Sequence, residues 1–239
     1  MLEIVAVPAF SDNYIWLVHD HESGETAVVD PGDAAPALAE AERRGWRIDQ
    51  VWNTHWHPDH TGGNLAVKAA TACTVAGPTR RDIPAIDVPL AEGAEVRIGH
   101  HRGRVIEVPG HTLDHLALIL EQAGVAFVGD TIFAMGCGRL FEGTPEQMFE
   151  SLRRLTGLAG ETRLYPAHEY TLANAMFAAH AEPDNLAIAE RLATIKALRE
   201  NGKITLPTTV AEERATNPFV RALNPSDFAR LRAEKDSFR

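Results

Sequence analysis

Residues 54–60, with the sequence THWHPDH, constrain this chain more than any other stretch. They carry three imidazoles and one carboxylate, all of which are good ligands for divalent first-row metals. Histidine is a rare residue, and a solvated loop has no reason to cluster it, so the stretch predicts a metal site. Residues 48–52 read as a strand before the cluster, and residues 61–63 as a tight turn before a helix-compatible run over 64–70. We therefore expect the ligands on a strand-to-helix loop, where scaffolds commonly present functional groups.

The spacing inside this stretch is compatible with more than one ion. His55 and His57 are two residues apart and can converge on one metal. Asp59 and His60 follow Pro58, whose fixed φ turns the chain and could direct both side chains toward a second ion.

Composition excludes several classes of protein. A chain of 239 residues with 45% hydrophobic and 23% charged residues is typical of a soluble globular protein with a substantial core. Its net charge of −10 argues against nucleic acid or an anionic membrane as the main partner. Residues 1–10 include Glu3 and lack a basic flank, so they read as a first strand and not as a signal peptide. Cys73 and Cys137 lie far apart and suggest no disulfide framework, which favours a reducing, cytoplasmic setting.

The pattern of elements changes near residue 170. Up to that point short strand candidates alternate with helices over 34–44 and from a Thr-Pro cap at 144–145 to about 155. Beyond it the composition is helical, no convincing strand pair is found, and residues 204–218 read as an irregular connection. We predict a mixed α/β domain over residues 1–169 and a helical C-terminal domain over residues 170–239. The predicted strands are residues 4–7, 14–18, 26–30, 48–52, 74–76, 85–88, 95–98, 104–108, 116–120, 125–128 and 163–165, and the predicted C-terminal helices are 173–181, 186–200 and 226–235.

Three further candidate ligands follow apolar strands. His111 comes after a Pro-Gly turn, Asp130 after a glycine, and His168 after the last predicted strand of the body. One histidine at a strand end is more often structural than metal-binding. Together with the first cluster, however, these residues give five His and two Asp, which suffice for two metals. A carboxylate that bridges two divalent ions is chemically sensible, because it has two oxygens and offsets the repulsion between the cations.

The ligand spacing, His-x-His-x-Asp-His followed by His111, Asp130 and His168, resembles the metallo-β-lactamase superfamily. Five shorter matches narrow the resemblance to the glyoxalase II (hydroxyacylglutathione hydrolase) family over essentially the full length. They are SDNY at 11–14, GCGR at 136–139, EGT at 142–144, HEY at 168–170 and RAEKD at 232–236. The metal motif belongs to the whole superfamily, whereas the C-terminal helical segment and its basic pair are specific to this family.

The resemblance implies an αββα sandwich with a small helical C-terminal domain and a binuclear metal site at one edge of two packed sheets. It assigns His55, His57 and His111 to one ion, and Asp59, His60 and His168 to the other. Asp130 and a hydroxide would bridge the two ions. The implied ions are zinc, with iron or manganese as alternatives, because His and carboxylate ligands suit all three.

The implied reaction is hydrolysis of S-(2-hydroxyacyl)glutathione thioesters, such as S-D-lactoylglutathione to glutathione and D-lactate, the second step of methylglyoxal detoxification. The bridging hydroxide would attack the thioester carbonyl, and the metals would stabilise the oxyanion. Asp59 could also accept a proton, although metal binding lowers its basicity.

The resemblance also assigns a substrate site. Arg139 and Tyr170 would contact the glutathione moiety. Arg232 and Lys235 would take its carboxylate, since residues three apart share one helix face; on spacing alone the pair reads as a solvated helix end. Phe141 replaces a tyrosine found in some relatives and so lacks one hydroxyl that could bind glutathione.

Some assignments remain open at this point. Asp114, where relatives often have glycine, is either a support for His111 or a solvated carboxylate. Rival functions are hydrolysis of a β-lactam, lactone or phosphodiester, a one-iron persulfide dioxygenase, or non-catalytic binding of glutathione or metal. Retention of Asp59, His60 and His168 argues against the one-iron enzyme. Metal identity, the preferred acyl group and the oligomeric state stay undetermined, and we expect a monomer.

Overall fold

The computed structural model describes residues 1–79 and 82–238, and the chain divides into two compact units. Unit 1 comprises Met1–Glu107 and Asp114–Gly129, and unit 2 comprises Val108–Leu113 and Asp130–Arg239. This division follows contacts between residues, whereas the predicted boundary near residue 170 followed the change in element type; that boundary stays a prediction. No helix in the described ranges is both long and apolar enough to cross a membrane.

The first sheet of unit 1 has six strands in sequence order, β1 to β6. The first three strands are antiparallel, and β3, β4, β5 and β6 run parallel to one another. Because the carboxyl ends of parallel strands meet at one edge of a sheet, the residues that follow β3 and β4 come together there. The strands are β1 (Leu2–Ala9), β2 (Asn13–Asp20), β3 (Thr26–Val29), β4 (Gln50–Trp52), β5 (Thr74–Gly77) and β6 (Val88–Pro89).

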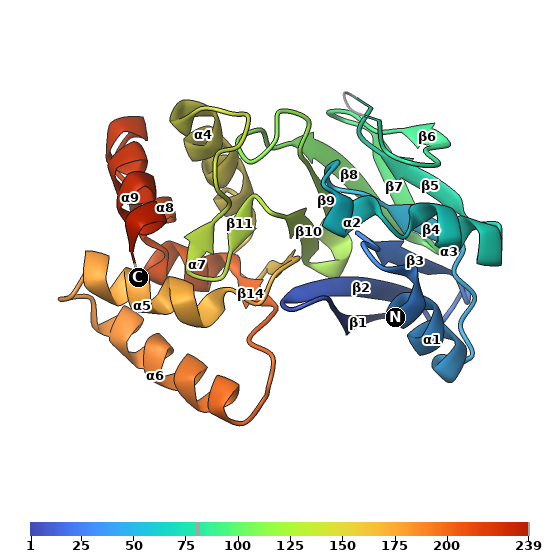
Figure 1. Ribbon diagram of the computed structural model, residues 1–239, viewed down its shortest axis with the longest axis horizontal. Coiled ribbons are helices and arrows are strands. Elements are labelled where there is room, and N and C mark those ends of the chain that lie inside the picture. Colours follow the sequence, from blue (N-terminus) through green and yellow to red (C-terminus); the bar gives the residue numbers. More distant parts are fainter. Residues whose placement is uncertain (80–81, 239) are drawn as a thin grey trace. The chain divides into compact units, whose positions relative to one another are not determined.

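Helices α1 (Ala34–Arg44) and α3 (Asn64–Thr71) pack on this first sheet (Figure 1). Their buried residues, including Ala37 and Val67, share one apolar cluster with Val51 of the sheet. Helix α1 spans the predicted residues. It begins where the Asp33 side chain accepts a hydrogen bond from the Ala35 N–H, and it ends at a left-handed Gly45.

The remaining strands of unit 1 form consecutive antiparallel hairpins: β7 (Glu95–Ile98), β8 (His101–Glu107), β9 (Leu116–Leu120) and β10 (Val125–Gly129). Every residue of β9 and β10 is buried, and the strands predicted over 116–120 and 125–128 are confirmed. Contacts join this group to the first sheet, since the rings of Trp52 and Phe127 lie 6.4 Å apart and Gln50 Nε2 donates to the Arg97 carbonyl at 2.9 Å.

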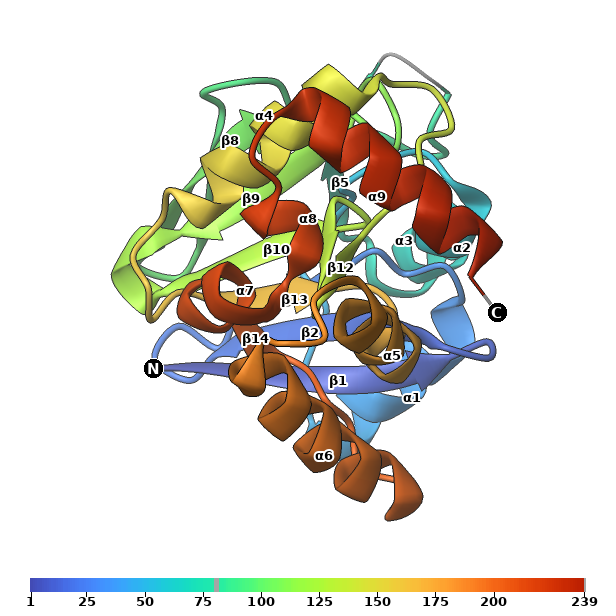
Figure 2. The same cartoon turned by 90° about the vertical axis from the view of Figure 1, so that its left-hand side faces the viewer.

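Unit 2 is mainly helical. Helices α5 and α6 lie against each other around Ala175, Ala178, Ile188 and Ile195 (Figure 2). Helix α4 begins with the predicted threonine cap, here a full capping box between Thr144 and Gln147. The helices are α4 (Pro145–Thr156), α5 (Thr171–Ala181), α6 (Leu186–Glu200), α7 (Val210–Thr216), α8 (Pro218–Arg221) and α9 (Pro225–Ser237), and the strands are β11 (Ile132–Phe133), β12 (Gly136–Cys137), β13 (Arg163–Pro166) and β14 (Thr208–Thr209).

Two sequence predictions are wrong in detail. Residues 204–218 are not irregular throughout, because β14 pairs with β13 and α7 and α8 follow it. The missed signal is Thr209-x-x-Glu212, which forms a complete capping box at the start of α7. The strand predicted over 85–88 is wrong except at its last residue, because β6 consists of Val88 and Pro89, which are both exposed.

Candidate metal centre

Unit 1 carries four of the predicted ligands on the segment that follows β4. Pro58 opens a one-turn helix, α2 (Pro58–Thr61), which brings Asp59 and His60 back beside the preceding histidines. His55 Nε2 lies 3.0 Å from His57 Nδ1, and His60 Nε2 lies 3.3 Å from Asp59 Oδ2. Two ligand atoms bound to one tetrahedral ion at about 2.0–2.1 Å are roughly 3.3–3.4 Å apart. Both pairs therefore have nearly the spacing of two ligands of one ion.

Asp30, which follows β3, orients two of these histidines. Its Oδ1 accepts the Thr54 N–H at 2.8 Å, and its Oδ2 accepts the Thr54 hydroxyl at 2.7 Å and lies 3.1 Å from His60 Nδ1. Because the Thr54 hydroxyl gives its hydrogen to Asp30, its oxygen accepts from His55 Nδ1, 3.1 Å away. His55 and His60 thus carry their protons on Nδ1, which leaves both Nε2 atoms able to bind a metal. Asp30 lies within 4.8 Å of His55 and His60 as a possible ligand, but its bonds to Thr54 make it a buried hydrogen-bond anchor for this segment.

Backbone geometry lets the loop after β3 approach this segment closely. Asp30 itself has a φ of 51°, a left-handed conformation that Asp tolerates better than most residues. At Gly32 an added Cβ would lie 1.8 Å from the Asp59 carbonyl oxygen, so any side chain there would displace the ligand loop.

Two further residues of unit 1 support the ligands. Asn13, the first residue of β2, donates from Nδ2 to Asp59 Oδ2 at 3.0 Å. This contact was missed, and its only signal was the SDNY match at residues 11–14. His115 stacks on His55, a predicted ligand, with ring centroids 4.6 Å apart and planes 19° apart.

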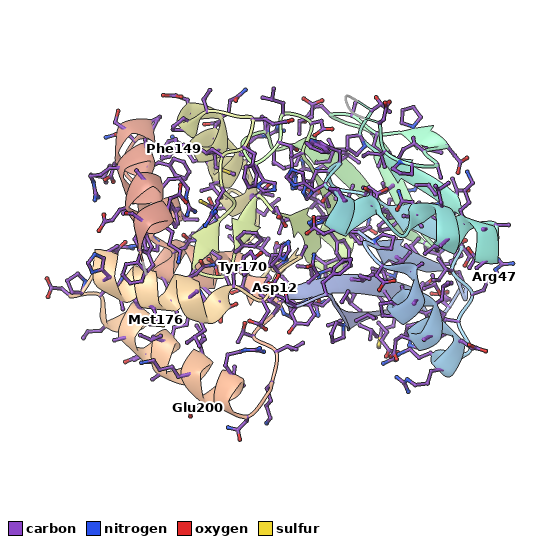
Figure 3. All side chains as sticks on the ribbon, in the orientation of Figure 1. Asp12, Arg47, Phe149, Tyr170, Met176 and Glu200 are labelled. Atoms are coloured by element: carbon purple, nitrogen blue, oxygen red, sulfur yellow. The ribbon has the colours of Figure 1, made fainter. Side chains whose placement is uncertain are left out.

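Unit 2 brings together the other three predicted ligands. Asp130 Oδ2 lies 3.4 Å from His111 Nε2 and also 3.4 Å from His168 Nε2. Both distances are close to the spacing of about 3.3–3.4 Å between two ligand atoms of one tetrahedral ion. His111 Nδ1 lies 2.8 Å from the Arg139 carbonyl and donates to it, which leaves its Nε2 as the nitrogen able to bind a metal. The His168 ring stacks on the ring of Tyr170, with the two ring centroids 4.7 Å apart. Tyr170 directly precedes α5 (Figure 3).

The predicted substrate residues all belong to unit 2. Phe141 is 64% exposed and places its ring 5.2 Å from that of His111. Tyr170 is partly exposed, and the Arg139 side chain is largely exposed with its Nε 3.8 Å from Asp236 Oδ1. Lys235 lies on α9, donates to the Ala173 carbonyl at 3.1 Å, and has its pKa lowered by burial and by the nearby positive charges of Arg232 and Arg139.

Arg232 has partners that the sequence did not reveal. It is only 6% exposed, donates from one terminal nitrogen to the Cys137 carbonyl at 2.9 Å, and pairs with Asp236 at 2.7 Å. The Cys137 thiol is buried beside it, and this burial raises the pKa of the thiol to about 11. A thiol that stays protonated at neutral pH is a poor nucleophile, which favours a structural role for Cys137.

Loss of the Thr54 hydroxyl is expected to weaken metal binding. In Thr54→Val the shape of the side chain is kept, but Asp30 and His55 lose the oxygen that joins them. Groups that orient metal ligands typically contribute roughly 10–100-fold in metal affinity, so we expect a decrease of that size. Competition for Zn²⁺ against a chromophoric chelator measures it, with Thr74→Val, at an exposed position of β5, as the control. Equal affinities of the two variants would contradict the proposed orienting role.

The comparisons with known proteins agree with this fold. Residues 9–168 match the family description "Metallo-beta-lactamase superfamily". ETHE1 from Myxococcus xanthus superposes with a TM-score of 0.76 at 24% identity, covering 100% of this chain and 92% of that one. A di-iron-bound form of TTHA1623 superposes with a TM-score of 0.64 at 25% identity, covering 91% and 99% of the two chains. The predicted metallo-β-lactamase fold is confirmed, and its His and Asp groups are able to bind a metal.

The C-terminal segment, residues 169–238, and two relatives identify the family within this superfamily. Residues 169–238 match the description "Hydroxyacylglutathione hydrolase C-terminus". The hydroxyacylglutathione hydrolase of Methylococcus capsulatus is 52% identical over 97% of this chain and 91% of its own length. That of Erythrobacter litoralis is 48% identical over the full length of both chains. The chain therefore belongs to the hydroxyacylglutathione hydrolase family of the metallo-β-lactamase superfamily.

Proposed function

We propose that the protein is a metal-dependent hydrolase of S-(2-hydroxyacyl)glutathione thioesters, which converts S-D-lactoylglutathione to glutathione and D-lactate as the second step of methylglyoxal detoxification. The observation that carries this proposal is a complete donor set of five His and two Asp in a chain of this family. The geometry inside each unit supports it, since the ligand atoms have the spacing of metal ligands and three imidazoles have their second nitrogen fixed.

In this proposal His55, His57 and His111 hold one divalent ion, and Asp59, His60 and His168 hold the other. Asp130 is shared by both. Zinc is the proposed metal, with iron or manganese compatible with the same ligands. When bound, the two ions would make water more acidic and would polarise the thioester carbonyl.

The chain's own side chains keep the ligands in the required state. Nδ1 protons on His55, His60 and His111 are held by Thr54, Asp30 and the Arg139 carbonyl, respectively. Donation from Asn13 to Asp59 stabilises the ionised carboxylate. Asp59 is thus better suited to be a ligand than a general base, and proton acceptance remains a secondary proposal for it.

We propose that basic and aromatic side chains of unit 2 bind the substrate, although the net charge of the whole chain is −10. Glutathione is an anionic peptide, so Arg139 and Lys235 supply electrostatic attraction, and the Tyr170 hydroxyl can donate a hydrogen bond. Phe141, whose ring lies 5.2 Å from that of His111, is proposed to contact the substrate without a hydroxyl. Arg232 is proposed to contribute its charge while it stays bonded to Cys137 and Asp236.

We also propose that the enzyme acts as a cytoplasmic monomer without a nucleic-acid partner. The acidic net charge and the two free, buried cysteines, Cys73 and Cys137, support this setting.

Hydrolysis of S-D-lactoylglutathione by protein of known metal content tests the function. We expect thioester loss and free thiol to appear together, to stop when a chelator removes the metals, and to return when Zn²⁺ is restored. A β-lactam serves as the control substrate. Fully metal-loaded protein that leaves the thioester intact would refute the proposal.

A further inference from the structure

The hairpin β11–β12 connects Asp130 with Arg139 and is held by a buried carboxylate. Glu213 of α7 is 0% exposed, and its Oε2 accepts the Met135 N–H at 2.8 Å. Met135 lies in the hairpin turn with a φ of 58°, an uncommon conformation for a residue with a side chain. The turn therefore depends on an acceptor that lies far away in the sequence.

Both oxygens of Glu213 are fully used. Oε1 accepts the Thr208 hydroxyl at 2.6 Å and lies 2.9 Å from a terminal nitrogen of Arg191. Oε2 accepts from Asn217 Nδ2 at 2.8 Å in addition to Met135. A buried carboxylate is costly unless its lone pairs are satisfied, and here each oxygen has two donors. An apolar residue would fill the same volume but would leave these donors without an acceptor.

The same C-terminal segment binds the neighbouring backbone groups of the hairpin. Asn174 of α5 donates to the Ala134 carbonyl at 3.2 Å, and Asn217 donates to the Gly136 carbonyl at 2.9 Å. Arg232 of α9 donates to the Cys137 carbonyl at 2.9 Å. With Glu213 on Met135, four consecutive residues of the hairpin are held by polar side chains from α5, α7, α9 and the residue before α8.

Movement of the turn would be passed on to the metal ligands. The Gly138 N–H donates to the Thr131 carbonyl at 3.2 Å, which closes the hairpin at its base. At Gly138 an added Cβ would lie 2.0 Å from the Asp130 carbonyl oxygen, so the two ends of the hairpin are in direct contact. The next carbonyl, that of Arg139, accepts from His111 Nδ1. The hairpin thus sets the position of Asp130 and the orientation of His111 together.

We propose that Glu213 is a positioning residue for the metal centre, acting through Met135 and the β11–β12 hairpin on Asp130 and on the carbonyl that orients His111. This inference rests on the proposed metal-binding function and adds to it. The C-terminal segment then has a second task besides substrate binding, which is to fix the ligands that unit 2 contributes.

The test compares Glu213→Gln with Glu212→Gln. A glutamine at 213 keeps one oxygen and replaces the other by an NH2 group. This NH2 group must face one of the two donor pairs, which then lacks an acceptor. Glu212→Gln removes the same charge from the adjacent residue of α7, and glutamine still suits the third position of the capping box. We expect Glu213→Gln to bind Zn²⁺ roughly tenfold more weakly in competition with a chelator, at the low end of the effects of orienting groups. The Met135 amide should also exchange its hydrogen faster, and excess Zn²⁺ should restore turnover. Glu212→Gln should match the parent in all three measurements.

A second variant covers the case in which Glu213→Gln does not fold. Asn217→Ser keeps an N-cap oxygen for α8 but removes the donor to Gly136 and Glu213, so it should weaken Zn²⁺ binding in the same direction. Unchanged Zn²⁺ affinity and Met135 exchange in a folded variant, with only a lower melting temperature, would overturn the inference. Both measurements work without substrate, so an inactive parent would count against the proposed function and not against Glu213.

Discussion

Replacing Asp130 by Ala is expected to lower both the metal content and the rate of thioester hydrolysis. Its Oδ2 is equidistant from His111 Nε2 and His168 Nε2, at 3.4 Å, so its loss removes a ligand from both proposed ions. Residues that merely orient a ligand contribute roughly 10–100-fold in metal affinity or activity, and a shared ligand should exceed that range. We expect kcat/KM for S-D-lactoylglutathione to fall more than a hundredfold, with elemental analysis showing fewer than two metals per chain.

The matched variants separate metal binding from other effects. Asp130→Asn keeps the size of the side chain and one oxygen, so it should retain more metal than Asp130→Ala. Asp184→Ala, at an exposed position between α5 and α6, should behave as the parent. Unchanged metal content in Asp130→Ala would mean that Asp130 is not a ligand. A parent with one metal per chain and full activity would contradict the binuclear proposal.

Local signals predicted most of the regular elements. Helix α1 and the strands β9 and β10 follow from apolar patterning and from the turns that bound them, and α4 follows from its cap. The error over residues 204–218 has the same local origin. The segment is polar and contains proline, which is typical of a loop, but Thr209 and Glu212 form a capping box, which is a helix signal in itself.

The candidate ligands could be predicted by residue type, but their supports could not. Asn13 is 46 residues from Asp59 in the sequence, and Glu213 is 78 residues from Met135. No periodicity or spacing rule relates such positions, because only the fold brings them together. The burial of Arg232 is a similar case. Helical spacing places it on one face with Lys235, but it does not reveal that the Cys137 carbonyl lies beneath its guanidinium.

Because Arg232 is buried, we expect different effects from replacing Arg232 and Lys235, the two basic residues of α9 predicted to bind the substrate. Lys235→Ala removes a charge proposed to bind the glutathione carboxylate. A charge-assisted contact contributes about 1.5–3 kcal/mol, so kcat/KM for the glutathione thioester should fall roughly tenfold to a hundredfold, mainly through KM. The metals should stay bound. A small thioester without the glutathione peptide should be hydrolysed slowly by the parent and almost equally by this variant.

Arg232→Ala should reduce activity on both substrates, because it also removes the donor to the Cys137 carbonyl and so loosens the hairpin between Asp130 and Arg139. We expect a KM effect at least as large as that of Lys235→Ala, together with weaker Zn²⁺ binding. Arg230→Ala is the control, since Arg230 lies on the same helix and pairs only with Asp227 and Glu234 among the described contacts.

If Lys235→Ala reduced hydrolysis of both thioesters equally, α9 would support folding and not recognition, because loss of a peptide contact cannot affect a substrate that has no peptide.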